Sequence, residues 1–457
     1  MIFSISEINK ILGNINFNGL NKNNLLFNKV SIDSRTISPE DLFIALQGEK
    51  FDGHDFLKNV LKTGVKAVVI NQGKQHLVPK NYPFWVVPDT KEAFQSLALF
   101  KRRKLKIPVI AITGSVGKTT TKEMTLEVLK SYGQVKVSEK NNNNEIGVGL
   151  TIHSCEGSDK LLVLEMGMRG RGQIEILSKF SEPNIAVITN IGSSHIGILG
   201  SRDAIAKAKC EITKYLNPNG VVIIPDGEPL LDDNLTKIWR GKIVKVKLEK
   251  NRKNIKLHSS NDDFIFGLYD SSKNIIQIEN KFFEISFKGI HNALNFLYVY
   301  AISRELGINF DEFNKFNFIN SNGRNRVINT KKLLIMDESY NASPESVKAC
   351  IKLLLDYPGR HFFIFGSMKE LGDKSEQYHI EIFKLINNSD IQRCIFICEK
   401  ELEIKIRKYC LNSEKVFIVN QIDNIIPIIN KITNKGDALL IKGSRYWQLD
   451  KLIPHIN

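Results

Sequence analysis

Apolar stretches of four or five residues alternate with longer amphipathic stretches through the middle of the chain. Short apolar runs are typical of strands buried on both faces, and helical periodicity between them is typical of the helices that cover such strands. The expected strands are residues 109–113, 161–165, 185–189 and 221–224, and the expected helices are residues 118–131 and 202–216. This alternation predicts an α/β unit whose parallel sheet has helices on both faces.

The pattern changes further along the chain and then returns. Residues 242–288 include stretches of period-two alternation, which predict antiparallel hairpins, and a helix is expected over residues 291–306. After residue 320, strands and helices alternate again. The expected strands of this second unit are residues 333–337, 362–366, 394–397, 416–419 and 438–441. They predict a Rossmann-like unit.

These changes of pattern predict three domains. Residues 1–87 are expected to form a mixed α/β domain, residues 88–320 a central domain around the parallel sheet, and residues 321–457 the Rossmann-like domain. A chain of 457 residues has room for this number, because domains typically contain about 100–200 residues.

The composition is that of a soluble globular protein, with 42% apolar and 25% charged residues. The first residues lack the basic and apolar regions of a secretory signal. No stretch of about 18 apolar residues runs without a charge, so no membrane span is expected. The six cysteines are scattered without a CxxC pair, which favours small core side chains and a reducing, cytoplasmic compartment.

The chain carries 64 basic and 49 acidic residues, a net charge of +15. Such an excess raises the alternatives of a nucleic-acid or anionic-membrane partner. The basic residues are mostly dispersed, however, and the local runs at 101–104 and 242–256 lack interleaved aromatic residues. Phosphate-backbone binding needs clustered charge. Lysine and asparagine are also abundant together, as in the asparagine run 141–144, so a compositional bias explains the charge better and no nucleic-acid partner is expected.

A glycine-rich segment between an expected strand and an expected helix carries the strongest chemical signal. Its sequence is Thr113-Gly114-Ser115-Val116-Gly117-Lys118-Thr119-Thr120. Backbone N–H groups of such a loop face a phosphate at the helix N-terminus. Lys118 is expected to neutralise the β- and γ-phosphates and Thr119 to ligate Mg²⁺. The usual spacing requires glycine at position 112, where Ile112 stands, so this ATP-binding loop is a shortened variant.

Polar side chains follow other strands of the two expected sheets. Glu165 ends one strand of the central sheet, and His195 follows another. Because ligands bind outside the carboxyl ends of parallel strands, these two side chains are expected to converge near the phosphate loop and hold a second Mg²⁺. Asp337, Gly366 and Lys442 lie at strand ends of the second unit. Two such edges suggest that domain closure brings a nucleotide and a second substrate together.

Several segments together resemble the Mur ligase family. Besides the phosphate loop, the resemblance rests on Leu164 to Gly167, Ala206 to Glu211, His291 to Asn295, Gly323-Arg324, Asp337 to Pro344, Gly366 to Gly372 and Lys442 to Arg445. Asp33 to Arg35 and Asp41 to Leu46 also fit. The resemblance therefore spans nearly the whole chain.

The resemblance implies an ATP-dependent amide ligase of peptidoglycan precursor synthesis in the cytoplasm. Asp337 to Pro344 and Lys442 to Arg445 favour the branch that joins D-alanyl-D-alanine to UDP-N-acetylmuramoyl-tripeptide. In that reaction ATP phosphorylates the tripeptide carboxylate, the amine attacks the acyl phosphate, and phosphate leaves. An N-terminal domain that binds the UDP-muramoyl-peptide, a central domain that binds ATP with two Mg²⁺ ions, and a monomer are expected.

The same resemblance assigns roles to single residues. Lys209 is implied to react with CO₂ and form a carbamate that orders the magnesium site. Lys207 is about 200° away around a helix and cannot face the same site. The implied catalytic set is Lys118, Lys209, Glu165 and His195, and the metal set is Thr119, Glu165 and His195. The other implied contacts are Asn295 with the adenine, Arg324 with the γ-phosphate, Asp337 and Asn341 with the nucleotide, Ser34 and Arg35 with the UDP-sugar, and Lys442 with substrate.

Four positions differ from the family pattern. Ser367 stands where the family usually has aspartate, Lys369 where it has alanine, and Gly149 and Asn322 where proline is common. Other functions remain open alternatives: another amide ligase of the superfamily, such as the enzyme that adds the third peptide residue or folylpolyglutamate synthase, a nucleic-acid-stimulated P-loop ATPase, or a nucleotide-switch protein without turnover. The third residue of the tripeptide, meso-diaminopimelate or lysine, stays undefined.

Overall fold

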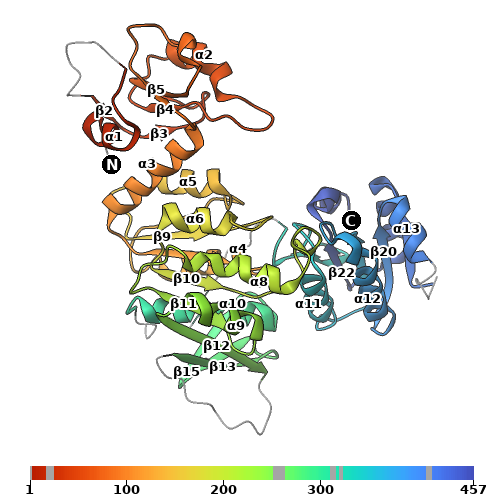
Figure 1. Cartoon of the computed structure of the whole chain (residues 1–457). Coiled ribbons are helices and arrows are strands. Elements are labelled where there is room, and N and C mark those ends of the chain that lie inside the picture. Colours follow the sequence, from red (N-terminus) through yellow and green to blue (C-terminus); the bar gives the residue numbers. More distant parts are fainter. Residues whose placement is uncertain are drawn as a thin grey trace.

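The chain folds into three α/β domains that follow one another along the sequence (Figure 1). The computed structural model describes residues 3–16, 25–250, 263–308, 315–316, 318, 323–407 and 414–456. The expected three-domain α/β architecture is confirmed. The expected boundary at residues 320 and 321 lies outside the described residues, as does Asn322.

The N-terminal domain is built on a small parallel sheet in the order β3-β4-β5-β6, beside an antiparallel pair β1-β2. Short apolar strands such as Ala67–Asn71 lie inside it because helices and loops cover both faces. Its elements are β1 (Phe3–Ser4), α1 (Ile5–Leu12), β2 (Leu26–Phe27), β3 (Val30–Ser31), β4 (Leu42–Ile44), α2 (Leu57–Lys62), β5 (Ala67–Asn71) and β6 (Phe84–Val87).

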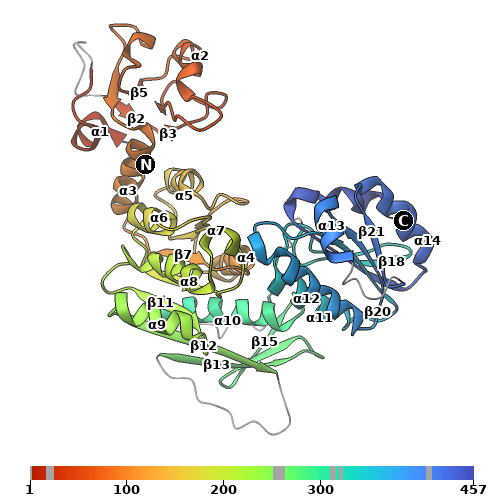
Figure 2. The same cartoon turned by 45° about the vertical axis from the view of Figure 1, so that its right-hand side comes forward.

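Helix α3 (Thr90–Leu105) belongs to two domains at once. Phe94 packs in the core of the N-terminal domain, whereas Ala98 packs in the core of the central domain. The ammonium group of Lys101 is buried and donates to the carbonyl of His153 at 2.5 Å. Figure 2 shows this helix running from the N-terminal domain down to the central sheet. The two domains are therefore joined by a shared helix.

The central domain is organised around one large sheet. Among the described residues, ten strands follow the order β16-β15-β14-β13-β12-β11-β10-β7-β9-β8. Helices α4 and α10 pack on one face, and α5, α6, α8 and α9 pack on the other. Its elements are β7 (Val109–Thr113), α4 (Lys118–Leu129), β8 (Val135–Val137), α5 (Glu145–His153), β9 (Leu161–Glu165), α6 (Gln173–Ser181), β10 (Ile185–Ile188), α7 (Ile196–Leu199), α8 (Arg202–Cys210), β11 (Val221–Pro225), α9 (Pro229–Ile238), β12 (Lys242–Lys250), β13 (Phe264–Asp270), β14 (Ile275–Ile278), β15 (Lys281–Ile285), α10 (Ile290–Glu305) and β16 (Lys315–Phe316).

Two sequence expectations for this domain need correction. The prediction of antiparallel hairpins over residues 242–288 is right for β13, β14 and β15 but wrong for β12, which pairs in parallel with both β11 and β13. Alternation along β12 shows that its two faces differ in burial, and it does not report strand direction. The expected helix 202–216 ends at Cys210, where a short 3₁₀ turn follows.

The C-terminal domain is also an α/β domain. Among the described residues, its sheet has six strands in the order β17-β18-β22-β19-β20-β21. Its strands run parallel except β17. Its elements are β17 (Arg326–Asn329), β18 (Leu333–Asp337), α11 (Pro344–Leu354), β19 (His361–Gly366), α12 (Ser375–Asn387), β20 (Ile391–Ile397), α13 (Lys400–Arg407), β21 (Val416–Val419), α14 (Ile425–Ile432) and β22 (Asp437–Lys442). Pro344 occupies the first turn of α11, as expected.

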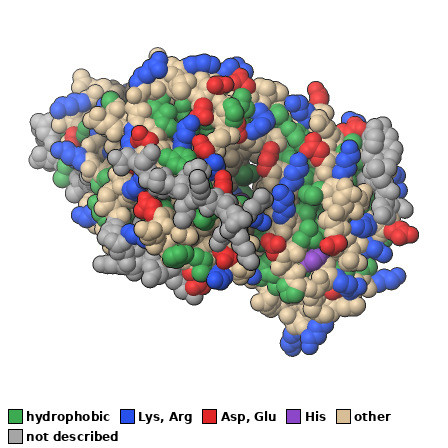
Figure 3. Space-filling model, turned by 90° about the horizontal axis from the view of Figure 1, so that it is seen from below, with side chains coloured by type: hydrophobic (Ala, Val, Ile, Leu, Met, Phe, Trp, Pro, Cys, Tyr) green, Lys and Arg blue, Asp and Glu red, His purple; other side chains and the backbone are tan. Residues whose placement is uncertain are grey.

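The surface carries charged side chains of both signs, and the five cysteines of the described residues are buried. Lys and Arg side chains are interleaved with Asp and Glu over the face shown in Figure 3. No helix in the described part of the chain is both long and apolar enough to cross a bilayer. Cys394 and Cys398, which bracket part of β20, are buried as predicted.

Candidate active site

The glycine-rich loop connects β7 to α4 at the carboxyl edge of the central sheet. Gly114 and Gly117 have φ angles of +150° and +84°, which L side chains rarely adopt. A Cβ on Gly114 would lie 1.9 Å from the hydroxyl oxygen of Thr189, and a Cβ on Gly117 would lie 2.7 Å from Oδ1 of Asn295. The loop thus fits closely between β10 and α10, which explains why glycine is needed at both positions.

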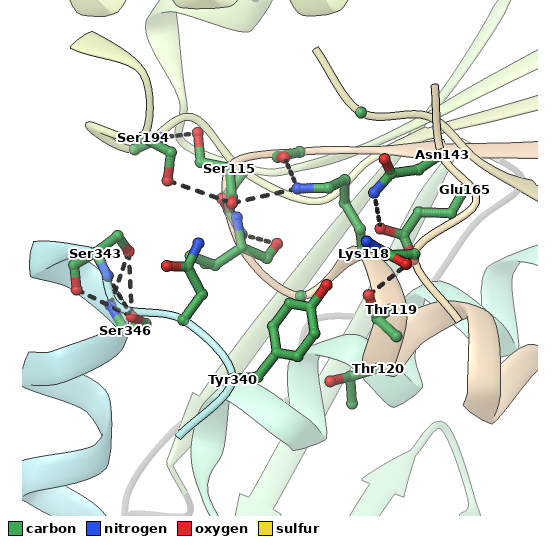
Figure 4. Close-up of a pocket in the computed structure, with 18 of the residues that line it drawn as sticks. Ser115, Lys118, Thr119, Thr120, Asn143, Glu165, Ser194, Tyr340, Ser343 and Ser346 are labelled. Atoms are coloured by element: carbon green, nitrogen blue, oxygen red, sulfur yellow. Dashed lines mark hydrogen bonds between the residues drawn. The ribbon is translucent and has the colours of Figure 1, made fainter. Parts of the chain in front are cut away.

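Lys118, the first residue of α4, folds back over this loop. Its ammonium group donates to the carbonyl of Gly114 at 2.7 Å (Figure 4). Burial lowers the pKa of Lys118, and the nearby carboxylate of Glu165 opposes that shift. A helix N-terminus beside a partly buried cation is a site for an anion such as a phosphate. The residues of the loop therefore fit a nucleotide phosphate.

Glu165 ends β9 and meets the phosphate loop. Its side chain is buried and accepts hydrogen bonds from the Thr119 hydroxyl at 2.7 Å and from the Asn143 amide at 2.8 Å. Carboxylate and hydroxyl oxygens are the ligands that Mg²⁺ prefers, so this pair fits a magnesium ion. The described residues contain no group of three His, Cys, Asp or Glu side chains arranged to hold a metal ion.

His195 adopts a left-handed conformation, with a φ angle of +64°, immediately before α7. Its Nδ1 lies 2.5 Å from Oε2 of Glu370, a residue of the C-terminal domain. The imidazole of His195 lowers the pKa of Glu370. His195 lines the same cavity as Glu165, but its Nδ1 pairs across the domain interface.

The two lysines of α8 lie in opposite environments. Lys209 is only 2% exposed, whereas the side chain of Lys207 is 60% exposed and pairs with Asp203 at 2.7 Å. Burial lowers the pKa of Lys209 far below its usual value, and the charge of Lys118 adds to this effect. The prediction that only one of them faces the site is confirmed, because Lys209 lines the cavity and Lys207 does not.

The cavity lies between the central and the C-terminal domains and has a volume of about 910 Å³. From the C-terminal side, the Tyr340 ring reaches into it (Figure 4) and stacks on the guanidinium group of Arg324, 3.7 Å from the ring centroid. Lys442, at the end of β22, is buried and donates to the carbonyl of Asn341 at 3.0 Å. The two domains together form the site.

Comparisons with known proteins agree with this geometry. Residues 112–303 match the Mur ligase middle domain, residues 323–445 the Mur ligase, glutamate ligase domain, and residues 27–102 the Mur ligase family, catalytic domain. A relative from Synechocystis sp., named UDP-N-acetylmuramoyl-tripeptide–D-alanyl-D-alanine ligase, is 36% identical over 94% of this chain and 92% of its own. The chain belongs to the Mur ligase family.

Two further relatives of this Mur ligase cover most of its length. A protein of the same name from Bacillus subtilis is 34% identical over 93% of this chain and 92% of its own. The crystal structure of MurF ligase from Thermotoga maritima in complex with ADP is 27% identical, has a TM-score of 0.81, and covers 94% of this chain and 96% of that one. The similarity extends over all three domains.

The Mur ligase structure brings most of the predicted site residues to one cavity. The predicted residues that line it are Gly114, Ser115, Val116, Gly117, Lys118, Thr119, Thr120, Glu165, His195, Lys209, Asn295, Arg324, Asn341 and Lys442. Asp337 does not line it, because its carboxylate is buried against the hydroxyl of Ser339 at 2.5 Å. Ser34 and Arg35 lie in the N-terminal domain, where Arg35 is exposed and pairs with Asp33 at 2.7 Å.

The sequence analysis missed further residues of the cavity, among them Asn143, Glu338 and His291. The amide of Asn143 donates a hydrogen bond to Glu165, although the sequence analysis attributed the asparagine run 141–144 to composition. The next residue, Asn144, caps α5 by accepting from the backbone N–H of Gly147. The sequence analysis predicted no helix after this run, so the signal of an asparagine N-cap was missed. Glu338 and His291 face Lys442; burial raises the pKa of Glu338 and lowers that of His291 to about 4.

Three of the four departures from the family pattern, Gly149, Ser367 and Lys369, lie among the described residues. A Cβ on Gly149 would lie 2.4 Å from the Phe94 ring, so glycine lets α5 approach α3. Ser367 is buried, accepts from the indole of Trp447 at 3.0 Å and donates to Glu399 at 3.1 Å. Lys369 pairs with the same carboxylate. A glutamate from the end of β20 therefore supplies negative charge beside Ser367.

Proposed function

We propose that this chain joins D-alanyl-D-alanine to UDP-N-acetylmuramoyl-tripeptide with ATP, giving the UDP-muramoyl-pentapeptide of peptidoglycan synthesis. The observation that carries the proposal is the similarity, through all three domains, to relatives that bear the name of this ligase. The substrates and ATP belong to the cytoplasm, where we place the reaction. We also propose a monomer, because the central and C-terminal domains of one chain form the cavity between them.

The chemistry requires an activated carboxylate. A carboxylate is a poor electrophile at neutral pH, so phosphorylation of the tripeptide terminus supplies a leaving group, and the dipeptide amine then attacks the acyl phosphate. The loop N–H groups and the Lys118 ammonium lie where they offset negative charge during phosphoryl transfer. Arg324, stacked on Tyr340, presents a second cation at the opposite wall of the cavity.

Of the two proposed Mg²⁺ ions, one would be held by Thr119 beside Glu165, and Glu165 and His195 would hold the second. When bound, Mg²⁺ offsets charge on the transferring phosphoryl group. The protein's own contribution is to keep the two oxygens buried and 2.7 Å apart, with Asn143 fixing the other carboxylate oxygen.

Lys209 is proposed to carry a CO₂-derived carbamate. Carbamate formation needs a neutral amine, and burial beside Lys118 favours the neutral form by lowering the pKa of Lys209. The carbamate would convert a side chain that repels cations into an anionic oxygen donor. Lys207, exposed and paired with Asp203, lacks these conditions.

The remaining assignments divide between the domains. Asn295, whose side chain touches the loop at Gly117, is proposed to approach the adenine, and Arg324 and Asn341 the phosphates and nucleotide from the C-terminal side. Ser34 and Arg35 are proposed to contact the UDP-sugar in the N-terminal domain, since the exposed guanidinium of Arg35 suits a phosphate or carboxylate. Lys442 orients the loop that carries Asn341.

The test is phosphate release from ATP across a panel of UDP-muramoyl-peptides, with and without D-alanyl-D-alanine. Release is expected only when the UDP-muramoyl-tripeptide and D-alanyl-D-alanine are both present. Release that requires meso-diaminopimelate or lysine as the acceptor would favour the third-residue-adding enzyme, and release with a folate and glutamate would favour folylpolyglutamate synthase. Stimulation by DNA or RNA would favour the P-loop ATPase alternative.

A further inference from the structure

The first turn of α11 reaches from the C-terminal domain into the central domain. Oε1 of Glu345 accepts hydrogen bonds from the backbone N–H of Ser193 at 2.9 Å and from its hydroxyl at 2.6 Å. Ser193 is 1% exposed, and Glu345 beside it is partly buried. An ionised carboxylate that accepts two hydrogen bonds binds its donors more strongly than a neutral acceptor does. Glu345 therefore forms a specific link between the two domains.

The segment that Glu345 contacts, residues 190–193, also forms hydrogen bonds with the phosphate loop. The backbone N–H of Gly192 donates to the hydroxyl of Ser115 at 2.9 Å, and the Asn190 side chain accepts from the N–H of Val116 at 3.0 Å. A Cβ on Gly192 would lie 2.9 Å from the carboxyl carbon of Glu345. Residues 190–193 thus contact the loop on one side and α11 on the other, with no room for a side chain at Gly192.

Two further observations show that the carboxylate is placed for this contact. Glu345 lies in the first turn of α11, where the helix dipole stabilises a negative charge, and Ser343 caps the same turn. Its second oxygen, Oε2, is buried without a hydrogen-bond partner among the described residues. The side chain is therefore held by Ser193 alone.

We propose that Glu345 is a positioning residue that couples docking of the C-terminal domain to the phosphate loop through Ser193. The proposal rests on the proposed function only in taking ATP as the nucleotide. Another contact between the two domains, that of Glu370 with His195, involves a predicted metal ligand, whereas the hydrogen bonds of Glu345 to Ser193 involve none. When the link is broken, the docked form is less populated, and apparent nucleotide affinity falls in proportion.

The experiment is a double-mutant cycle on the full chain. For each variant, the dissociation constant of ADP in the presence of Mg²⁺ and the kcat of ligation are measured. Glu345→Ala removes both hydrogen bonds and is expected to weaken ADP about tenfold, whereas Ser193→Ala removes one and is expected to cost about threefold. The double variant should bind ADP no worse than Glu345→Ala, because both changes break the same link. The kcat of ligation should fall more in Glu345→Ala than in Ser193→Ala, and the KM for the UDP-substrate should not change.

Two controls separate coupling from a general loss of structure. Glu345→Gln keeps an acceptor oxygen and is expected to stay within about threefold of the unaltered protein. Lys348→Ala lies on the same helix but breaks only a pair with Glu381 inside the C-terminal domain, so ADP affinity should not change. Additive losses, unchanged affinity in Glu345→Ala, or equal losses in Lys348→Ala would overturn the proposal. The ADP measurements need no peptide substrate. They therefore test the coupling role of Glu345 even if the chain does not ligate D-alanyl-D-alanine.

Discussion

Gly117→Ala should damage nucleotide use far more than it damages the fold. The φ angle of +84° makes any L side chain there cost about 1–2 kcal/mol. The new Cβ would lie 2.7 Å from Oδ1 of Asn295, although ordinary contact begins at 3.4 Å, so loop and side chain must separate by about 0.7 Å. A displacement of this size in a phosphate-positioning group costs up to about 10²-fold in rate. We expect kcat/KM for ATP to fall about 10- to 100-fold.

The matched control is Gly227→Ala, in the turn between β11 and α9. Gly227 has nearly the same φ angle, +79°, but a Cβ there would meet nothing within 4 Å, and the residue is outside the cavity. Both variants should lower the midpoint of thermal unfolding by roughly 2–4 °C per kcal/mol, and only Gly117→Ala should change steady-state ATP kinetics. Equal kcat/KM for ATP in the two variants would refute the assignment of the loop.

Three other substitutions test the remaining assignments. Lys118→Ala should keep the fold, checked by circular dichroism, and lose about 10²–10³-fold in kcat because the cation facing the phosphates is gone; near-normal turnover would contradict its role. Arg35→Ala should raise the KM for the UDP-substrate and leave the KM for ATP unchanged, and an unchanged UDP-substrate KM would make Asp33 to Arg35 a structural turn. Lys209→Ala should be nearly inactive and partly rescued by a short carboxylic acid in the buffer, whereas Lys207→Ala should stay active; equal loss at both positions would refute the carbamate.

The central sheet could be predicted because its strands carry a strong local signal. Residues 109–113, 161–165 and 185–188 are buried on both faces, so the apolar runs in the sequence mark them directly. The direction of β12 could not be predicted, because alternation reports which face of a strand is buried and says nothing of its partner. Strand pairing is a tertiary property that no local pattern encodes.

In the candidate site, too, the features set by spacing along the chain could be predicted, and those set by tertiary contacts could not. The phosphate loop and the opposite placement of Lys207 and Lys209 follow from spacing along a chain segment, and the structure agrees. Asp337 ends a strand as predicted, but its turn with Ser339 directs the carboxylate away from the cavity, and the next residue, Glu338, faces it instead. One position along a strand end reverses the direction of a side chain, and a motif alone does not fix that direction.

The shared helix α3 determines where this polypeptide tolerates cleavage. A fragment ending at residue 107 would keep α3 but leave Lys101 without the His153 carbonyl and Arg102 without the Ser181 carbonyl, which accept their hydrogen bonds in the intact chain. The same fragment would expose to water the apolar face of α3 that packs in the core of the central domain, including Ala98. The first two domains should therefore be expressed and purified together, and a protease should cut the folded chain elsewhere before it cuts within α3.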